Sequence, residues 1–122
     1  MNGVQFRAGF ARVDITPPLG IPVVGYFEER FAKKVLDPLE ANAIAVSDGE
    51  NTAVLIAADL LGIEGAAFSS ALRSRIASAA GIADNAVFLH CTHTHTGPGA
   101  GVADDLIAGQ LRLLDGIRRA GV

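Results

Sequence analysis

The stretch that decides the fold is TAVLIAADLLGIEGAAFSSALRSRIASAAGIADNAVFLHC, residues 52–91. Its two ends, 52–58 and 86–91, are short apolar runs with the length and composition of buried strands. The apolar residues between them recur every fourth position, at Phe68, Leu72, Ile76 and Ala80, which predicts an amphipathic helix over 64–80 with Gly81 as its C-terminal cap. A strand, a crossover helix and a second strand almost always form a right-handed unit with parallel strands. The stretch therefore predicts a β-α-β unit.

The residues before this unit add antiparallel strands. EANAIAV at 40–46 is joined to 52–58 by SDGEN, and its Asp-Gly pair supplies the positive φ of a tight hairpin turn. Residues 5–14 have the pattern of a further strand, and ITPPLGIP at 15–22 is predicted to be a loop because of its three prolines. The charged segment 25–38 fits either a short helix or an irregular excursion.

A second helix is predicted over residues 104–119. Ile107, Leu111 and Leu114 share one face, and the acidic start and basic end of the segment complement the helix dipole. The expected fold class is α/β: a mixed β-sheet with a β-hairpin and a right-handed β-α-β unit, with helices packed on the sheet. Because 122 residues is the length of one ordinary domain, a single domain over 1–122 is expected.

The composition limits the kinds of molecule that the chain is expected to bind. Half of the residues are apolar and the net charge is -3, with basic residues dispersed along the chain, so a nucleic acid or an anionic membrane is not an expected partner. The single cysteine, Cys91, excludes an internal disulfide. MNGVQFRAGF at 1–10 has no apolar h-region, so a signal peptide is not expected, and AVLIAADLLGI at 53–63 is too short to span a bilayer. These features predict a cytoplasmic protein that acts on a small molecule.

All three histidines of the chain lie within FLHCTHTHTGPGAG, residues 88–101. Alternation in an extended backbone would turn His93 and His95 to one side and Thr92, Thr94 and Thr96 to the other. Two imidazoles facing one point suit two ligands of one zinc ion, or one ligand beside a group that transfers a proton or stabilises an oxyanion. His90 falls on the threonine side, which favours a structural role, and Cys91 is expected to pack in the core.

Further site residues follow from the ends of the parallel strands, where ligands bind in open α/β sheets. Asp59 comes directly after strand 52–58, and two kinds of role are open for it: a structural one, as a strand-end cap or helix-entry residue, or that of a catalytic-site carboxylate that orients a ring N–H of a metal-bound histidine. The residues predicted to form a substrate loop are Thr94, Thr96, Gly97 and Gly99. The two glycines would allow the backbone to approach a substrate closely.

Several segments together resemble the N-terminal region of the neutral/alkaline non-lysosomal ceramidases and their bacterial relatives. In order, they are AGFARVDITPPLG at 8–20, VVGYFEER at 23–30, LDPLEANAIAVSDGE at 36–50, AADLLGI at 57–63 and THTHTGP at 92–98. The resemblance implies an α/β catalytic domain and zinc-dependent hydrolysis of an N-acyl amide, with a lipid-like substrate. By motif position it implies that His93 is a zinc ligand and that His95 contacts the attacked amide or its oxyanion.

The family draws its other zinc ligands, a histidine, a glutamate and a tyrosine, from much farther along a longer chain. No histidine or glutamate follows His95 here, and Tyr26 lies upstream of the motif. The resemblance therefore implies that the missing ligands come from another chain, another region or a symmetry mate. The alternative is a non-catalytic, self-associating remnant of such a domain. Both alternatives predict a homo-oligomer or a missing C-terminal partner.

Two other enzyme classes place H-x-H after a buried strand. Metallo-β-lactamase-like hydrolases use H-x-H-x-D-H, and the aspartate and third histidine are absent after His95, which makes this class the weaker hypothesis. Amidohydrolase barrels need about 250 residues, which excludes them for this chain.

Overall fold

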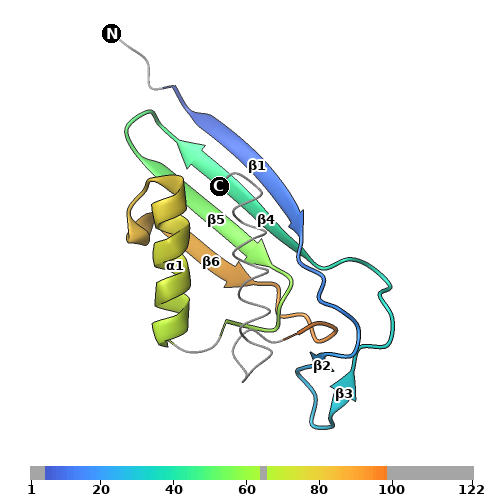
Figure 1. Cartoon of the computed structure of the whole chain (residues 1–122). Helices are drawn as coiled ribbons and strands as arrows, with labels where there is room; N and C mark the ends of the chain where they lie inside the picture. Colours follow the sequence, from blue (N-terminus) through green and yellow to red (C-terminus); the bar gives the residue numbers. More distant parts are fainter. Residues whose placement is uncertain (1–4, 64–65, 99–122) are drawn as a thin grey trace.

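The computed structural model describes residues 5–63 and 66–98 as a four-stranded mixed sheet with a helix on one face (Figure 1). The strand order is β1-β4-β5-β6. The elements of this sheet and of the crossover are β1 (Arg7–Asp14), β4 (Glu40–Ser47), β5 (Thr52–Ala58), α1 (Ala66–Ala80), the 3₁₀ turn η1 (Asp84–Ala86) and β6 (Val87–Cys91). β1 and β5 each pair antiparallel with β4, whereas β5 and β6 are parallel. The predicted α/β class, with its hairpin and β-α-β unit, is confirmed.

The hairpin turn forms as the Asp-Gly pair predicts. Gly49 has φ +99°, and Asp48 Oδ1 accepts hydrogen bonds from the backbone N–H groups of Glu50 at 2.9 Å and Asn51 at 2.7 Å. These bonds favour the ionised carboxylate, and they hold the pKa of Asp48 below its ordinary value.

Asp48→Asn is expected to lower stability at neutral pH and to lose this effect in acid. A depressed folded pKa stabilises the fold above the ordinary value of about 3.9, and this contribution disappears as the pH falls through the folded pKa. The urea midpoints of the wild-type chain and Asp48→Asn should thus differ at pH 7 and converge below about pH 3.9. Glu50→Gln, which changes the neighbouring exposed carboxylate, is the control; a constant difference for Asp48→Asn at all pH values would contradict the prediction.

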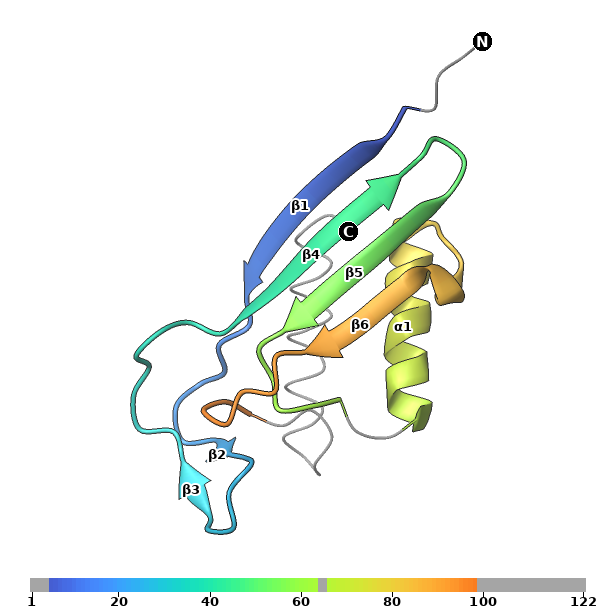
Figure 2. The same ribbon diagram turned by 180° about the vertical axis from the view of Figure 1, so that it is seen from behind.

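The core lies between the sheet and α1. Val54 and Ile56 of β5 and Leu72 and Ile76 of α1 are its largest fully buried side chains. The predicted helix period is confirmed at Leu72 and Ile76. α1 lies in front of the sheet in Figure 1 and behind β6 in Figure 2, so it covers one face.

The opposite face carries a row of exposed apolar side chains, here called the outer row. It contains one residue from each strand, and the strand register places them side by side: Phe10, Ile44, Leu55 and Phe88. Their exposed fractions are 77%, 40%, 40% and 61%, respectively.

Residues 15–39 form an excursion from the end of β1 to the start of β4. Its base is closed by a hydrogen bond from the Ile15 N–H to the Leu39 carbonyl at 2.8 Å. The excursion contains two short antiparallel strands, β2 (Pro22–Val23) and β3 (Arg30–Phe31). The segment that the sequence left open between helix and irregular structure is therefore irregular apart from β3, and the predicted loop at 15–22 ends in the first residue of β2.

Three predictions lie outside the described residues: the second helix at 104–119, the first two residues of the predicted helix 64–80, and the position of Gly99. Of the helices in the described ranges, none has the length and apolarity needed to cross a membrane.

Candidate functional site

The site lies at the carboxyl ends of the parallel strands β5 and β6. Asp59 follows β5, and the loop 92–98, here called the histidine loop, follows β6. Two backbone hydrogen bonds connect the start of this loop to the end of β5 and to the residues after it: Thr92 N–H to the carbonyl of Ala58, the last residue of β5, at 3.0 Å, and His93 N–H to the Leu60 carbonyl at 3.1 Å. The predicted meeting of the two strand ends is confirmed.

The imidazoles of His93 and His95 lie edge to face, with ring centroids 4.9 Å apart and planes at 80°. The predicted proximity is confirmed, but the reason given for it was wrong. His93 has φ +63°, which is the left-handed region, so the histidine loop is not an extended strand. A tight turn at His93 brings the rings together, and such backbone strain in a residue other than glycine is concentrated at functional sites.

Backbone carbonyls set the tautomer of both rings. His93 Nδ1 lies 2.8 Å from the Leu61 carbonyl oxygen, and His95 Nδ1 lies 2.9 Å from that of Gly25. Because a carbonyl oxygen can only accept, each Nδ1 carries a hydrogen and donates it. In the neutral ring Nε2 then holds the lone pair, which is the arrangement of metal-binding histidines whose other nitrogen is oriented by a protein acceptor.

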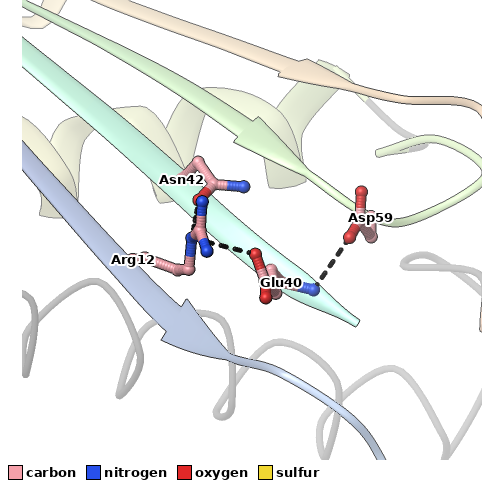
Figure 3. A network of polar contacts seen from close by, with 4 residues as sticks. All are labelled: Arg12, Glu40, Asn42 and Asp59. Atoms are coloured by element: carbon pink, nitrogen blue, oxygen red, sulfur yellow. Dashed lines mark hydrogen bonds and ion pairs between the residues drawn. The ribbon is translucent and has the colours of Figure 1, made fainter. Parts of the chain in front are cut away.

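Asp59 ties the strand ends together. Its Oδ2 accepts the backbone N–H of Glu40 at 2.9 Å (Figure 3), and its Oδ1 accepts the Thr92 hydroxyl at 3.1 Å. These contacts match the strand-end role that the sequence left open, since carbonyls rather than this carboxylate orient the two rings. A catalytic role for Asp59 stays a prediction.

Glu40 also belongs to a polar network on the sheet. Arg12 Nε lies 3.1 Å from Glu40 Oε2 and 3.0 Å from Asn42 Oδ1, which connects the ends of β1 and β4 (Figure 3). The Arg12 side chain is 72% exposed, so solvent screening leaves this ion pair only a small contribution to stability.

A cavity of ≈ 980 Å³ lies between the excursion and the histidine loop. Its lining includes Asp59 and Thr92, and also Thr94, Thr96 and Gly97 of the predicted substrate loop, whereas neither imidazole lines it. The Thr94 and Thr96 hydroxyls are 3.0 Å apart. Gly97 is buried, and a Cβ there would come within 3.1 Å of the Leu39 side chain, so this glycine permits close packing of the loop on the excursion.

The excursion also supplies side chains that sequence reasoning missed. Tyr26 lies edge to face with His95 at 5.9 Å between ring centroids, and the guanidinium carbon of Arg30 lies 3.6 Å from the centre of the Tyr26 ring. Gly25, which accepts the His95 hydrogen bond, precedes Tyr26. The sequence feature that could have indicated these residues is the VVGYFEER segment, because it has a glycine followed by an aromatic residue in a stretch without clear periodicity.

The described residues offer part of a zinc site. A catalytic zinc takes three protein ligands, and His93 and His95 supply two candidates. Within residues 5–63 and 66–98, no group of three or more histidine, cysteine, aspartate or glutamate side chains could hold a metal ion. Cys91 is half-buried and packs against the core, as expected, and its burial raises the pKa of the thiol. His90 is exposed and contacts Phe88, with ring centroids 5.5 Å apart.

Known proteins resemble this chain in fold. No protein-family model and no curated protein matches the sequence. Among solved structures, the neutral ceramidase from Pseudomonas aeruginosa matches with a TM-score of 0.75 and 22% identity, over 98% of this chain and 21% of that chain. The fold is that of the neutral ceramidases.

A second structure, a ceramidase complexed with C2, matches with a TM-score of 0.69 and 23% identity, over 96% of this chain and 20% of that chain. The chain thus spans about a fifth of the length of the ceramidases that it matches. The resemblance drawn from the sequence motifs is confirmed at the level of the ceramidase fold.

Proposed function

We propose that the chain forms part of a zinc-dependent hydrolase site for N-acyl amides, with a lipid-like substrate. The observation that carries this proposal is the pair of imidazoles at the strand ends, each donating Nδ1–H to a backbone carbonyl and leaving Nε2 for another partner. The ceramidase-like fold supports it, since both of the similar solved structures are structures of ceramidases.

In this proposal His93 is a zinc ligand through Nε2, and His95 is a second ligand or the group that acts on the amide. When bound, zinc lowers the pKa of a water molecule to about 7 and polarises a carbonyl. The tautomer constrains the role of His95. With its hydrogen on Nδ1, the neutral ring can ligate a metal or accept a proton at Nε2, whereas donation to an oxyanion requires a second proton.

In this proposal the imidazoles at the strand ends bind zinc by themselves, and the ligands that complete a catalytic site come from outside the described residues: from another region or another polypeptide. The expected cytoplasmic location and the lack of a nucleic-acid partner stay predictions from the composition.

Zinc titration by calorimetry tests the proposal. The chain should bind zinc, and His93→Ala should weaken the affinity at least about tenfold, because loss of a ligand exceeds the effect of losing an orienting partner. His95→Ala should have the same effect where His95 is the second ligand, and should leave the zinc affinity nearly unchanged where His95 acts on the amide. His90→Ala is the matched control, since this third histidine is exposed and lies outside the pair. No zinc uptake, or uptake that survives in both variants, would overturn the zinc site.

A second candidate function is self-association, and the outer row favours it. Across the strands the row reads Phe10, Ile44, Leu55, Phe88, with an aromatic residue at each end and an aliphatic pair between. A two-fold axis between β4 and β5 would place Phe10 against Phe88 of the partner subunit and Ile44 against Leu55 of the partner subunit. The row is therefore complementary to a second copy of itself, as an isologous interface requires.

The area of the outer face determines how strongly two copies of the chain are expected to associate. Four strands about 4.8 Å apart and seven residues at about 3.3 Å each give a face of about 440 Å² in flat projection. Two such faces bury about 900 Å², which is in the range of weak, transient interfaces. We expect a dimer whose population depends on concentration.

Sedimentation over a wide concentration range tests this dimer. Leu55→Lys should raise the dissociation constant at least tenfold, because it places a charge at the centre of the face. Phe27→Lys is the control, as Phe27 is fully exposed in the excursion and lies outside the outer row. A chain that stays monomeric, or a dimer unaffected by Leu55→Lys, would contradict self-association through this face.

A further inference from the structure

We infer that the loop between β2 and β3, residues 24–29, together with Arg30, is a positioning element that sets the tautomer and the ring orientation of His95. The inference deepens the proposed function and rests on it, because the chemical role of His95 is proposed there. Gly25 of this loop lies 70 residues before His95 in the chain, so only the fold brings the two residues into contact.

Gly25 makes the contact that sets the tautomer. Its carbonyl accepts the His95 Nδ1–H at 2.9 Å. A Cβ at this position would lie 2.6 Å from Nδ1 and 3.1 Å from both Cε1 and Cγ of the ring, and Gly25 has φ +97°. Space and backbone conformation both require glycine here, because any side chain would displace the ring or change the direction of the carbonyl.

Tyr26 limits the rotation of the ring. It meets His95 edge to face at an interplanar angle of 84°, and His95 meets His93 in the same manner at 80°. The His95 ring therefore contacts two aromatic neighbours while its Nδ1 is hydrogen-bonded. Edge-to-face contact is a preferred geometry for aromatic pairs, so each neighbour favours the observed orientation.

Arg30 acts through Tyr26. Its guanidinium carbon lies 3.6 Å from the centre of the Tyr26 ring, which is a cation–π contact, and Tyr26 is 43% exposed. A half-exposed tyrosine has little packing to fix its ring, so the guanidinium on its face supplies the restraint. Guanidinium, phenol and two imidazoles form one continuous series from Arg30 to His93.

The backbone fixes the loop relative to the histidine loop. The Val24 N–H donates to the Gly97 carbonyl at 3.2 Å, and the β2–β3 pair is extended by hydrogen bonds from Gly20 N–H to the Ala32 carbonyl at 2.8 Å and from Ala32 N–H to the Ile21 carbonyl at 2.9 Å. Loop 24–29 and the histidine loop thus meet at a backbone contact beside the ring contact. The Nε2 atom of His95 is the ring nitrogen left to a metal or substrate.

Nitrogen-15 NMR of the histidine rings in the metal-free chain tests the inference, at a pH well above the ordinary imidazole pKa of about 6.5. The wild-type chain should show His95 as the Nδ1–H tautomer. Gly25→Ala and Tyr26→Ala should each convert it to a mixture of the two tautomers, and Tyr26→Phe should restore the wild-type signals because it keeps the ring. Arg30→Ala should shift the His95 signals in the same direction as Tyr26→Ala.

Phe27→Ala is the matched control, since Phe27 is in the same loop but fully exposed. Its His95 signals should equal those of the wild-type chain. Because Gly25→Ala could alter the loop as a whole, the backbone amide spectrum is recorded for each variant, and Tyr26→Ala tests the same ring at a half-exposed position. Unchanged His95 ring signals in Tyr26→Ala and Gly25→Ala would overturn the inference.

Zinc titration of the same variants separates this inference from the proposed function. Where His95 is the second zinc ligand, Gly25→Ala should weaken zinc binding about tenfold, as expected for loss of its orienting partner. If the His95 tautomer responds to the loop variants but the chain takes up no zinc, the positioning role of the loop is supported and the zinc site is contradicted. If zinc binding depends on His93 but the His95 tautomer does not respond to the loop variants, the zinc site is supported and the positioning role of the loop is contradicted.

Discussion

Ile56→Ala is expected to destabilise the chain by about 2–5 kcal/mol, the usual range for truncating a large aliphatic side chain in a core. Ile56 has an exposed fraction of 0%, and it packs in the core cluster that contains Leu72 and Ile76 of α1. Small domains have total stabilities of about 5–15 kcal/mol, so this substitution removes a large share of the free energy of unfolding. Urea denaturation followed by circular dichroism measures it.

Leu55→Ala is the matched control. Leu55 is the preceding residue on the same strand, but it belongs to the outer row and is 40% exposed. Removing its side chain leaves no enclosed cavity, so the free energy of unfolding should change much less than in Ile56→Ala. Equal losses in the two variants would show that the outer row is covered as completely as the core, and would contradict the assignment of one buried and one exposed face.

The elements of the fold could be predicted from the sequence because their signals are local. The period of α1, the Asp48-Gly49 turn and the apolar run of β5 each depend on neighbouring residues, and each lies where it was predicted. The pairing of β1 with β4 involves residues that are far apart in the chain, such as Phe10 and Ile44, and no local pattern contains it.

The exposure of the outer row also lay beyond the sequence pattern. The run TAVLIAA at 52–58 is apolar at successive positions, which is typical of a strand buried on both faces. In the described residues, α1 covers one face of the sheet (Figures 1 and 2). Val54 and Ile56 are buried, whereas Leu55, which alternates to the opposite face of the strand, is 40% exposed. The sequence thus indicates that the second face of the strand is apolar, but it does not indicate which surface covers that face. A second copy of the chain is the occupant proposed above.

The candidate site was only partly predictable for a similar reason. The position of His93 and His95 beyond a parallel strand follows from the order of the elements, whereas the left-handed turn at His93 depends on hydrogen bonds to Leu60 and Leu61. The contact of His95 with Gly25 joins residues 70 positions apart. Contacts between residues so far apart in the chain form only when the excursion folds back on the strand ends, so the local sequence does not predict them.

Asp59→Ala is expected to cost about 1–3 kcal/mol, the range for leaving a buried or partly buried hydrogen-bonding group without its partner. The carboxylate accepts the Glu40 N–H at 2.9 Å and the Thr92 hydroxyl at 3.1 Å, and it thereby joins β4 to the first residue of the histidine loop. Its removal should therefore speed amide hydrogen exchange at Glu40 and loosen the loop that carries both imidazoles.

Asp59→Asn separates the structural role of this residue from the predicted catalytic one. The amide keeps one oxygen acceptor in nearly the same shape, so it should preserve more of the stability than alanine does. If Asp59 acts only as the strand-end tie, zinc affinity should follow stability across the two variants, with Asp59→Asn close to the wild-type chain. A stable Asp59→Ala variant that loses zinc binding would instead establish that the carboxylate orients a histidine, since orientation of a ligand and stability of the strand end would then be independent.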